Sequence, residues 1–273
     1  MSEELNRRTF IQRTALGAGS LALLPSVLAA EPLAAGARSK AEGLVAFRIL
    51  PGQWLTDDRF RAMLGFFGKY PDTADELAFF TSGTHAPLPL AEMQKRAERL
   101  GKLMPQVRQA GMAAGINILT TMGHHEENLE SSLNEPWQRV VDPQGRESKG
   151  SFCPGGVEFL AYVEKVYTAL AGASPDFIWI DDDVRLLGHL PISYTCFCEA
   201  CVGRFSAQMQ RTFTRETLVS AFSSGSLEER LACRRAWLEH NRAMINNLFR
   251  VIEQTVHKLK PGLPLGFMTG DRF

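Results

Sequence analysis

The chain has 273 residues, of which 45% are hydrophobic, and its 30 basic residues balance its 30 acidic ones. This length and composition are those of a globular protein with one substantial core. A balanced charge without a basic stripe lacks the electrostatic surface of a nucleic-acid-binding protein, so we expect no nucleic acid partner and a substrate that is neutral or held by local groups.

The amino-terminal 30 residues look like a twin-arginine export signal. Arg7 and Arg8 precede an apolar run over residues 15–30, in the order that such signals have. The run contains glycine and proline and is too short and weakly apolar to span a membrane comfortably. We therefore expect residues 1–30 to direct export to the periplasm or the exterior, with an uncleaved amino-terminal tether as the alternative. Residues 31–43, rich in alanine and glycine, are expected to be a flexible lead-in.

Short apolar runs, typical of buried strands, alternate along the rest of the chain with segments whose apolar residues have helical spacing. The expected strands are residues 44–50, 76–80, 115–122, 176–180 and 264–269. The expected helices are residues 57–70, 90–110 and 157–170, followed by a helical region that runs to about residue 260 with a break at 223–226. A long polar loop is expected over residues 123–152, a length typical of functional or disordered segments.

This alternation predicts parallel strands with right-handed crossovers. We predict an α/β fold of the (β/α)8 TIM-barrel type over residues 44–273, because polar residues gather after the second, third and fourth strands and no glycine-rich phosphate loop follows the first. A complete barrel usually needs about 250 residues, and the long loops use up this chain after about five strand-helix units. The barrel is therefore expected to be incomplete, as in a truncated or split protein, which a partner chain or an oligomer could complete. The alternatives are a different number of strands or a sheet that is open by design.

Four cysteines predict either a metal site or disulfides. Cys196, Cys198 and Cys201 lie within six residues of one another, and Cys153 precedes the intervening helix and strand. Four thiolates hold a structural zinc ion tetrahedrally and leave no open position for chemistry. Two disulfides are the alternative that an exported protein allows, although a zinc ion loaded in the cytoplasm fits the export of a folded protein better. Cys233, in a helical stretch, is expected to be a small buried apolar residue.

Three consecutive carboxylates, Asp181, Asp182 and Asp183, follow the apolar strand that ends at residue 180. They cannot continue into a core without a cost in ionisation or pairing, so they lie where the strand meets water or a site. Because side chains alternate along a strand, one or two of them can point into a barrel mouth. Close carboxylates raise one another's pKa, which makes one of them a candidate proton donor. The alternative is an ion-pair cluster with Arg185.

The region between residues 152 and 205 resembles a known family. Phe152-Cys-Pro, then Trp179-Ile-Asp-Asp-Asp, then Cys196-Phe-Cys-Glu-Ala-Cys-Val-Gly-Arg-Phe205 is similar to the central stretch of glycoside hydrolase family 42 β-galactosidases. In that family a Cys-Pro precedes a helix, an Asp-Asn-Glu sequence ends the fourth strand, and a Cys-aromatic-Cys-x-x-Cys cluster binds zinc. The resemblance implies a (β/α)8 barrel that hydrolyses glycosidic bonds with an acid/base after the fourth strand and a nucleophile after the seventh.

Carried over residue by residue, the resemblance places Asp183 at the acid/base glutamate and Asp182 at the preceding asparagine. Both positions depart from the family pattern. The shorter aspartate stands about one methylene farther from a leaving group, and an Asp-Asp pair resembles instead the tandem acids of substrate-assisted hexosaminidases. The nucleophile after the seventh strand has no counterpart in this sequence. The predicted function is therefore an exported glycoside-hydrolase-like protein with a structural zinc ion, active if its barrel is completed. The alternative is a non-catalytic or vestigial carbohydrate-binding barrel.

Histidine and tryptophan residues near the strand ends are weaker candidates for sugar binding. His85 follows the second strand, and His124 and His125 follow the third; all three could line a sugar pocket. Trp54 and Trp137 could stack on sugar rings, although packing in the core is at least as good an interpretation. A third class of function, a metal-dependent hydrolase, would use His124, His125 and the aspartates as ligands.

Overall fold

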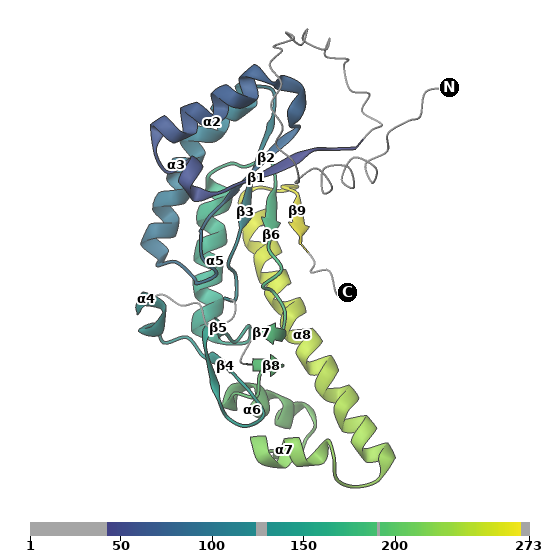
Figure 1. The fold of residues 1–273 in the computed structure, drawn as a ribbon. Helices are drawn as coiled ribbons and strands as arrows, with labels where there is room; N and C mark the ends of the chain where they lie inside the picture. The colour runs from purple at the N-terminus through teal and green to yellow at the C-terminus, as the bar shows by residue number, and fades with distance from the viewer. Residues whose placement is uncertain (1–42, 124–129, 190–191, 269–273) are drawn as a thin grey trace, which may run out of the picture. The chain divides into compact units, whose positions relative to one another are not determined.

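A five-stranded parallel sheet in the order β1-β2-β3-β6-β9 forms the centre of the molecule (Figure 1). The computed structural model describes residues 43–123, 130–189 and 192–268, which lie in one compact unit, Arg38–Phe273. The strands of this sheet are β1 (Ala46–Ile49), β2 (Glu76–Phe80), β3 (Ala113–Ile118), β6 (Ile178–Ile180) and β9 (Leu265–Phe267).

Helices connect these strands, and three of them, α3, α5 and α8, pack side by side. The helices are α2 (Asp57–Lys69), α3 (Leu90–Gln109), α4 (Glu130–Leu133), α5 (Val157–Gly172), α6 (Glu199–Gln208), α7 (Arg215–Ala221) and α8 (Leu227–Leu259), with single 3-10 turns η1 (Pro51–Gln53) and η2 (Pro71–Thr73). None of the helices in the described ranges is long and apolar enough to cross a membrane.

The predicted alternation of strands and helices is confirmed in order, but the third strand ends earlier than expected. The prediction was residues 115–122, whereas β3 ends at Ile118. The backbone N–H groups of residues 121–123 donate hydrogen bonds to the Asp183 carboxylate and not to a neighbouring strand. The chain therefore leaves the sheet after Ile118. The cause is a tertiary contact, which local spacing of apolar residues does not encode.

Two antiparallel hairpins were not predicted. The first, β4 (Arg139–Val141) with β5 (Glu147–Phe152), lies within the expected long loop, and the second, β7 (Leu187–His189) with β8 (Ile192–Tyr194), lies between the aspartates and the cysteines. The turn of the first hairpin is held by Asp142, whose side chain accepts the backbone N–H groups of Gln144 and Arg146. Strands of three residues are too short to show a reliable period-2 pattern.

The predicted break at residues 223–226 is the amino-terminal cap of α8. Ser226 and Glu229 form a capping box, in which the Ser226 hydroxyl accepts from the Glu229 N–H at 3.2 Å and the Glu229 carboxylate accepts from the Ser226 N–H at 2.8 Å. This arrangement satisfies two of the backbone N–H groups that a helix start leaves without partners.

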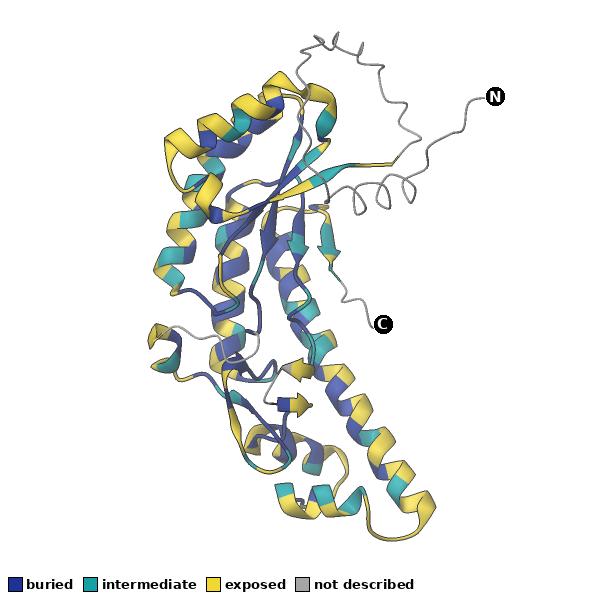
Figure 2. Ribbon diagram, viewed as in Figure 1, coloured by how far each residue is buried: buried dark blue, intermediate teal, exposed yellow. Residues whose placement is uncertain are grey.

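The buried side chains of the described residues form two hydrophobic clusters, and α8 contributes to both; buried residues recur along this helix in Figure 2. The larger cluster lies between the sheet and the helices, where β2, β3 and β6 direct alternate residues against α3 and α5; its α8 members are Leu248, Ile252 and Val256. The smaller cluster surrounds the cysteines and includes Trp237 and Met244 of α8. The region of the cysteines is therefore attached to the sheet domain through one continuous helix.

Candidate active site and candidate metal centre

Alternate residues of the sheet point away from the helices. Ile116 and Ile118 of β3 belong to the helix-side cluster, so Asn117 between them points to the opposite face. The same parity brings four further side chains to this face. We call this surface the inner face, and its residues are Arg48, Phe80, Asn117, Trp179 and Asp181.

Arg48 connects four strands across the inner face. Its Nε donates to Asn117 Oδ1 at 2.7 Å, and its Nη2 forms an ion pair with Asp181 Oδ2. Asn117 Nδ2 donates to the same carboxylate oxygen at 3.1 Å, and the guanidinium group lies 4.2 Å from the centre of the Phe80 ring. The first of the three aspartates is thus neutralised on the inner face by groups from β1 and β3.

Asp183 points elsewhere and anchors the loop after β3. Its Oδ2 accepts the backbone N–H groups of Thr121 at 2.7 Å, Met122 at 2.5 Å and Gly123 at 2.9 Å. The residue is 1% exposed, and its Oδ1 has no hydrogen-bond partner in the described part of the chain. The side chain therefore acts as a clamp on the backbone through one of its oxygens.

Burial raises the pKa of Asp183 to about 8, although the three N–H donors oppose this shift; the nearby Asp181 carboxylate adds to it. The group is consequently protonated at neutral pH. Because Oδ2 is occupied by three donors, the proton belongs on Oδ1. Asp182, between them in sequence, is 37% exposed and forms an ion pair with Arg185 at 2.8 Å, which is the pairing expected for this cluster in the alternative interpretation.

The loop held by Asp183 is also fixed from the side of β5. The Phe152 N–H donates to Met122 O at 2.8 Å, and the Ser151 hydroxyl donates to Gly123 O at 3.3 Å. Gly123 has a φ of +88°, and a Cβ at this position would lie 1.8 Å from Gly150 O, so no larger residue fits. The loop is therefore locked between the end of β6 and β5.

Of the side chains predicted to bind sugar, His85, Trp54 and Trp137 lie in the described residues. His85 is half-buried in the turn after β2, and His124 and His125 lie outside the described residues. Trp54 has no exposed surface and donates its Nε1–H to Phe80 O at 3.2 Å, so it offers no stacking face. Trp137 is buried against Tyr162, with ring centres 4.3 Å apart. Both tryptophans pack in the core, which was the alternative interpretation.

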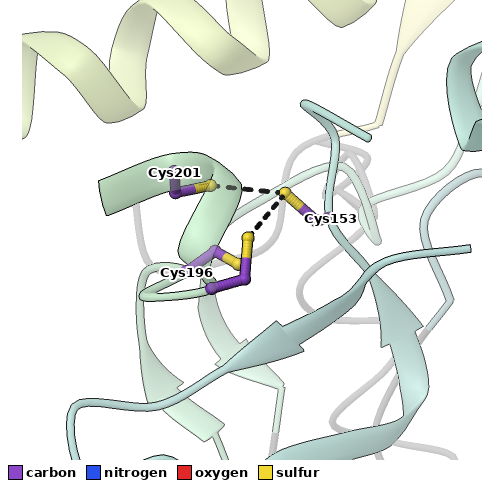
Figure 3. Close-up of side chains that lie close together, drawn as sticks. Cys153, Cys196 and Cys201 are labelled. Atoms are coloured by element: carbon purple, nitrogen blue, oxygen red, sulfur yellow. Dashed lines mark hydrogen bonds between the residues drawn. The ribbon is translucent and has the colours of Figure 1, made fainter. Parts of the chain in front are cut away.

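The four predicted cysteines converge into one buried group (Figure 3). All four Sγ atoms lie within 4.8 Å of one another, and the Sγ of Cys153 is 3.4 Å from that of Cys201 and 3.9 Å from that of Cys198. Thiolates about 2.3 Å from a tetrahedral zinc ion are separated by about 3.8 Å, so the donor set and its spacing fit such an ion. None of the four is in a disulfide.

The start of α6 and the Arg204 guanidinium favour negative charge on the thiols, whereas hydrogen bonds among the thiols shift their pKa values in opposite directions. Cys198 is the N-cap residue of α6, and Cys201 lies in the first turn of that helix, where backbone N–H groups stabilise a thiolate. Hydrogen bonds among the thiols, foremost with Cys153, lower the pKa of Cys198 and raise that of Cys201. The Arg204 guanidinium contacts Cys201 Sγ at 3.5 Å and donates to Gly155 O at 3.0 Å. A cation can therefore replace the protons of the thiols in a site already prepared for charge.

The hydrogen bonds of Arg48 and Asn117 to Asp181 were not predicted from the sequence, and neither were the separate roles of the three aspartates. A signal was present, because Arg48 is a charged residue inside an otherwise apolar predicted strand, and such a charge requires a buried partner. Trp179 and Asp181 share a strand face by simple alternation.

The fold is an α/β fold of the (β/α) TIM-barrel type. In this class, ionisable residues of the site lie at the carboxyl ends of the parallel strands. Among solved structures, the chain is similar to the catalytic domain of β-amylase from Paenibacillus polymyxa, with a TM-score of 0.51 and 11% sequence identity over 81% of this chain. The chain spans 65% of the length of that domain. At this identity the likeness shows the fold alone.

A hypothetical protein from Ruminiclostridium thermocellum ATCC 27405 aligns with a TM-score of 0.46 and 9% identity, covering 81% of this chain and 95% of the other. No family model and no curated protein sequence matches the chain.

We predict that Asp183→Asn changes how stability depends on pH. In the unfolded chain the carboxyl group ionises near pH 3.9, and in the folded chain near pH 8. Between these values the folded state binds more protons, so the free energy of unfolding of the wild type falls as pH rises, by at most about 1.4 kcal/mol per pH unit. Urea unfolding at pH 5, 6.5 and 8 should show the wild type losing stability relative to Asp183→Asn.

The matched control is Asp58→Asn, because the Asp58 side chain is 93% exposed on α2. It should track the wild type at every pH. A stability difference between the wild type and Asp183→Asn that stays constant from pH 5 to pH 8 would contradict the raised pKa.

Proposed function

We propose that this protein is glycoside-hydrolase-like and acts on glycosidic bonds. The observation that carries the proposal is the carboxylate cluster at the carboxyl end of β6, in a barrel-type fold shared with the catalytic domain of a β-amylase. Catalytic residues of TIM-barrel enzymes lie at this end of the strands. The resemblance of residues 152–205 to family 42 β-galactosidases supports the same substrate class.

In this proposal Asp183 is the general acid and Asp182 its acidic neighbour. A general acid must carry its proton at the working pH, and a pKa of about 8 meets that condition. Oδ1 is the oxygen that would pass the proton, since Oδ2 is taken by the three backbone N–H groups. The second carboxylate of the two-carboxylate mechanism would come from a completing segment or from the acetamido group of the substrate.

One observation favours the second candidate function, a non-catalytic carbohydrate-binding barrel. Asp183 is 1% exposed and holds a loop in place, which is a structural role that needs no substrate. A third candidate, a metal-dependent hydrolase, has no support in the described residues, where the only group of potential ligands for a metal ion is the four cysteines.

We further propose that the four cysteines bind zinc. Tetrahedral thiolate ligation closes the coordination sphere, so the ion would hold the segment after β5 against the start of α6 and would take no part in chemistry. We also propose export through the twin-arginine pathway, on the strength of Arg7, Arg8 and the apolar run that follows.

A panel of aryl glycosides distinguishes the first two candidate functions. We expect turnover by the wild type, a fall in kcat/KM as pH rises through about 8 because the acid is lost, and a loss of at least about 100-fold in Asp183→Asn with retained folding. Asp58→Asn should keep full activity. Glycan binding without turnover of any substrate would establish the non-catalytic function instead.

Metal analysis and chelation test the zinc site. We expect one zinc ion per chain, lost in Cys201→Ser but kept in Cys233→Ala, because Cys233 lies outside the four-thiol group. Removal of the ion by a chelator should lower the melting temperature by more than about 10 °C, and a thiol reductant alone should not. Sensitivity to the reductant with no bound metal would establish disulfides, and more than one ion per chain would revive the metal-dependent hydrolase.

The export signal is tested by cell fractionation. The wild-type precursor should reach the periplasm or the medium, whereas replacement of Arg7 and Arg8 by lysine should leave it in the cytoplasm. Equal export of both would refute the twin-arginine assignment.

A further inference from the structure

The inner face carries a second set of polar groups that the proposed catalytic pair does not include. We propose that Arg48, Asn117, Asp181 and Trp179 bind one neutral sugar ring. The inference takes its ligand class from the proposed function, but it stands on the geometry of different residues. It also gives Asp181 a role of its own, because its carboxylate lies on the inner face, whereas Oδ2 of Asp183 holds the loop at residues 121–123.

Unused hydrogen-bonding capacity lies side by side on this face. A guanidinium group has five N–H donors. In Arg48, Nε donates to Asn117 and Nη2 to Asp181, and Nη1 has no hydrogen-bond partner among the described residues. The Arg48 side chain remains 35% exposed. The Asp181 carboxylate accepts from Arg48 and Asn117 through Oδ2 and from the Asp182 N–H through Oδ1 at 2.9 Å. Of its roughly four lone-pair sites, one is left unused, on a side chain that is 10% exposed.

A sugar ring matches this pattern, because each hydroxyl group is both a donor and an acceptor. One hydroxyl can accept from Arg48 Nη1 while its neighbour on the ring donates to the Asp181 carboxylate. Hydrogen bonds to ionised groups are the stronger kind. The ion pair between Arg48 and Asp181 thereby supplies both halves of a recognition site for adjacent hydroxyls.

The charges on the inner face favour a neutral sugar over an acidic one. Arg48 and Asp181 cancel each other, so the site presents no net positive charge to a carboxylate.

The rings of Trp179 and Phe177 have their centres 5.0 Å apart, and each approaches a glycine of a neighbouring strand. A Cβ built at Gly266 of β9 would come within 2.9 Å of the Trp179 ring, and one built at Gly115 of β3 within 2.1 Å of the Phe177 ring. Each ring therefore occupies the space that a side chain at that glycine would take. Trp179 is only partly buried, so its indole offers the apolar surface on which the C–H face of a sugar packs.

Titration calorimetry of the full chain with methyl glycosides of neutral hexoses, and with glucuronate as the acidic probe, tests the inference. We expect millimolar or tighter binding of at least one neutral glycoside, weakened at least about tenfold in Asp181→Asn and Arg48→Lys by loss of a charged hydrogen bond. Trp179→Phe should also weaken binding while leaving the ion pair intact. This variant tests the site even if the two charge variants fail to fold.

The matched controls are Asp58→Asn and Arg61→Lys. These two residues form an ion pair at 2.6 Å on the exposed surface of α2, so they repeat the chemistry of the substitutions away from the inner face. Both controls should bind as the wild type does, and the melting temperature of every variant should be measured to separate folding from binding.

Three results would overturn the inference: no neutral glycoside binds at millimolar concentration, binding survives unchanged in all three inner-face variants, or glucuronate binds more tightly than the neutral sugars. The inference and the proposed function fail separately. Binding that depends on Asp181 without any turnover would leave the inference standing and refute the hydrolase. Turnover whose KM is unaffected by Asp181→Asn would do the reverse.

Discussion

The need to neutralise the carboxylates that follow β6 organises the surrounding structure. Carboxylates that leave water must be paired or protonated, and the chain uses both solutions within three residues. Asp181 is paired with Arg48, which draws β1 and β3 into contact with the end of β6. Asp183 is protonated and accepts three backbone N–H groups from residues 121–123. The first solution shapes the inner face and the second fixes the loop that leads to His124.

The cysteine centre and the Asp183 clamp act on the same element from its two sides. The loop at residues 121–123 is held by Asp183 and leans on β5, whose last residue donates a hydrogen bond to it. Cys153 follows β5 directly and joins the thiols at the start of α6. Metal at the thiols would therefore stabilise the loop after β3 indirectly, through β5. The thiol group also contacts Met244 of α8, a helix that packs on the sheet domain as well.

Local patterns were sufficient for the fold class and for the grouping of the four cysteines. Apolar runs predicted the strands, and the helical spacing of apolar residues predicted the helices. Three of the four cysteines also lie close together in sequence. The hairpins were missed because strands of three residues show too little periodicity. The third strand was predicted to be too long because the N–H groups of residues 121–123, which follow β3, donate to the carboxylate of Asp183, about 60 residues away in sequence. The roles of the tryptophans could not be predicted for a similar reason, because an aromatic ring such as that of Trp54 suits both a hydrophobic core and a sugar-binding site.

The order of strands, their parallel pairing, the convergence of polar residues at the carboxyl ends and the thiol ligand set all follow from the amino-acid sequence, because each depends on spacing along the chain. The division of labour among Asp181, Asp182 and Asp183 does not. These three identical side chains stand at or beyond the end of a strand, where the period that orients side chains stops. Their roles were decided by which partners, Arg48 and Asn117 or the loop at residues 121–123, other strands bring within hydrogen-bonding distance.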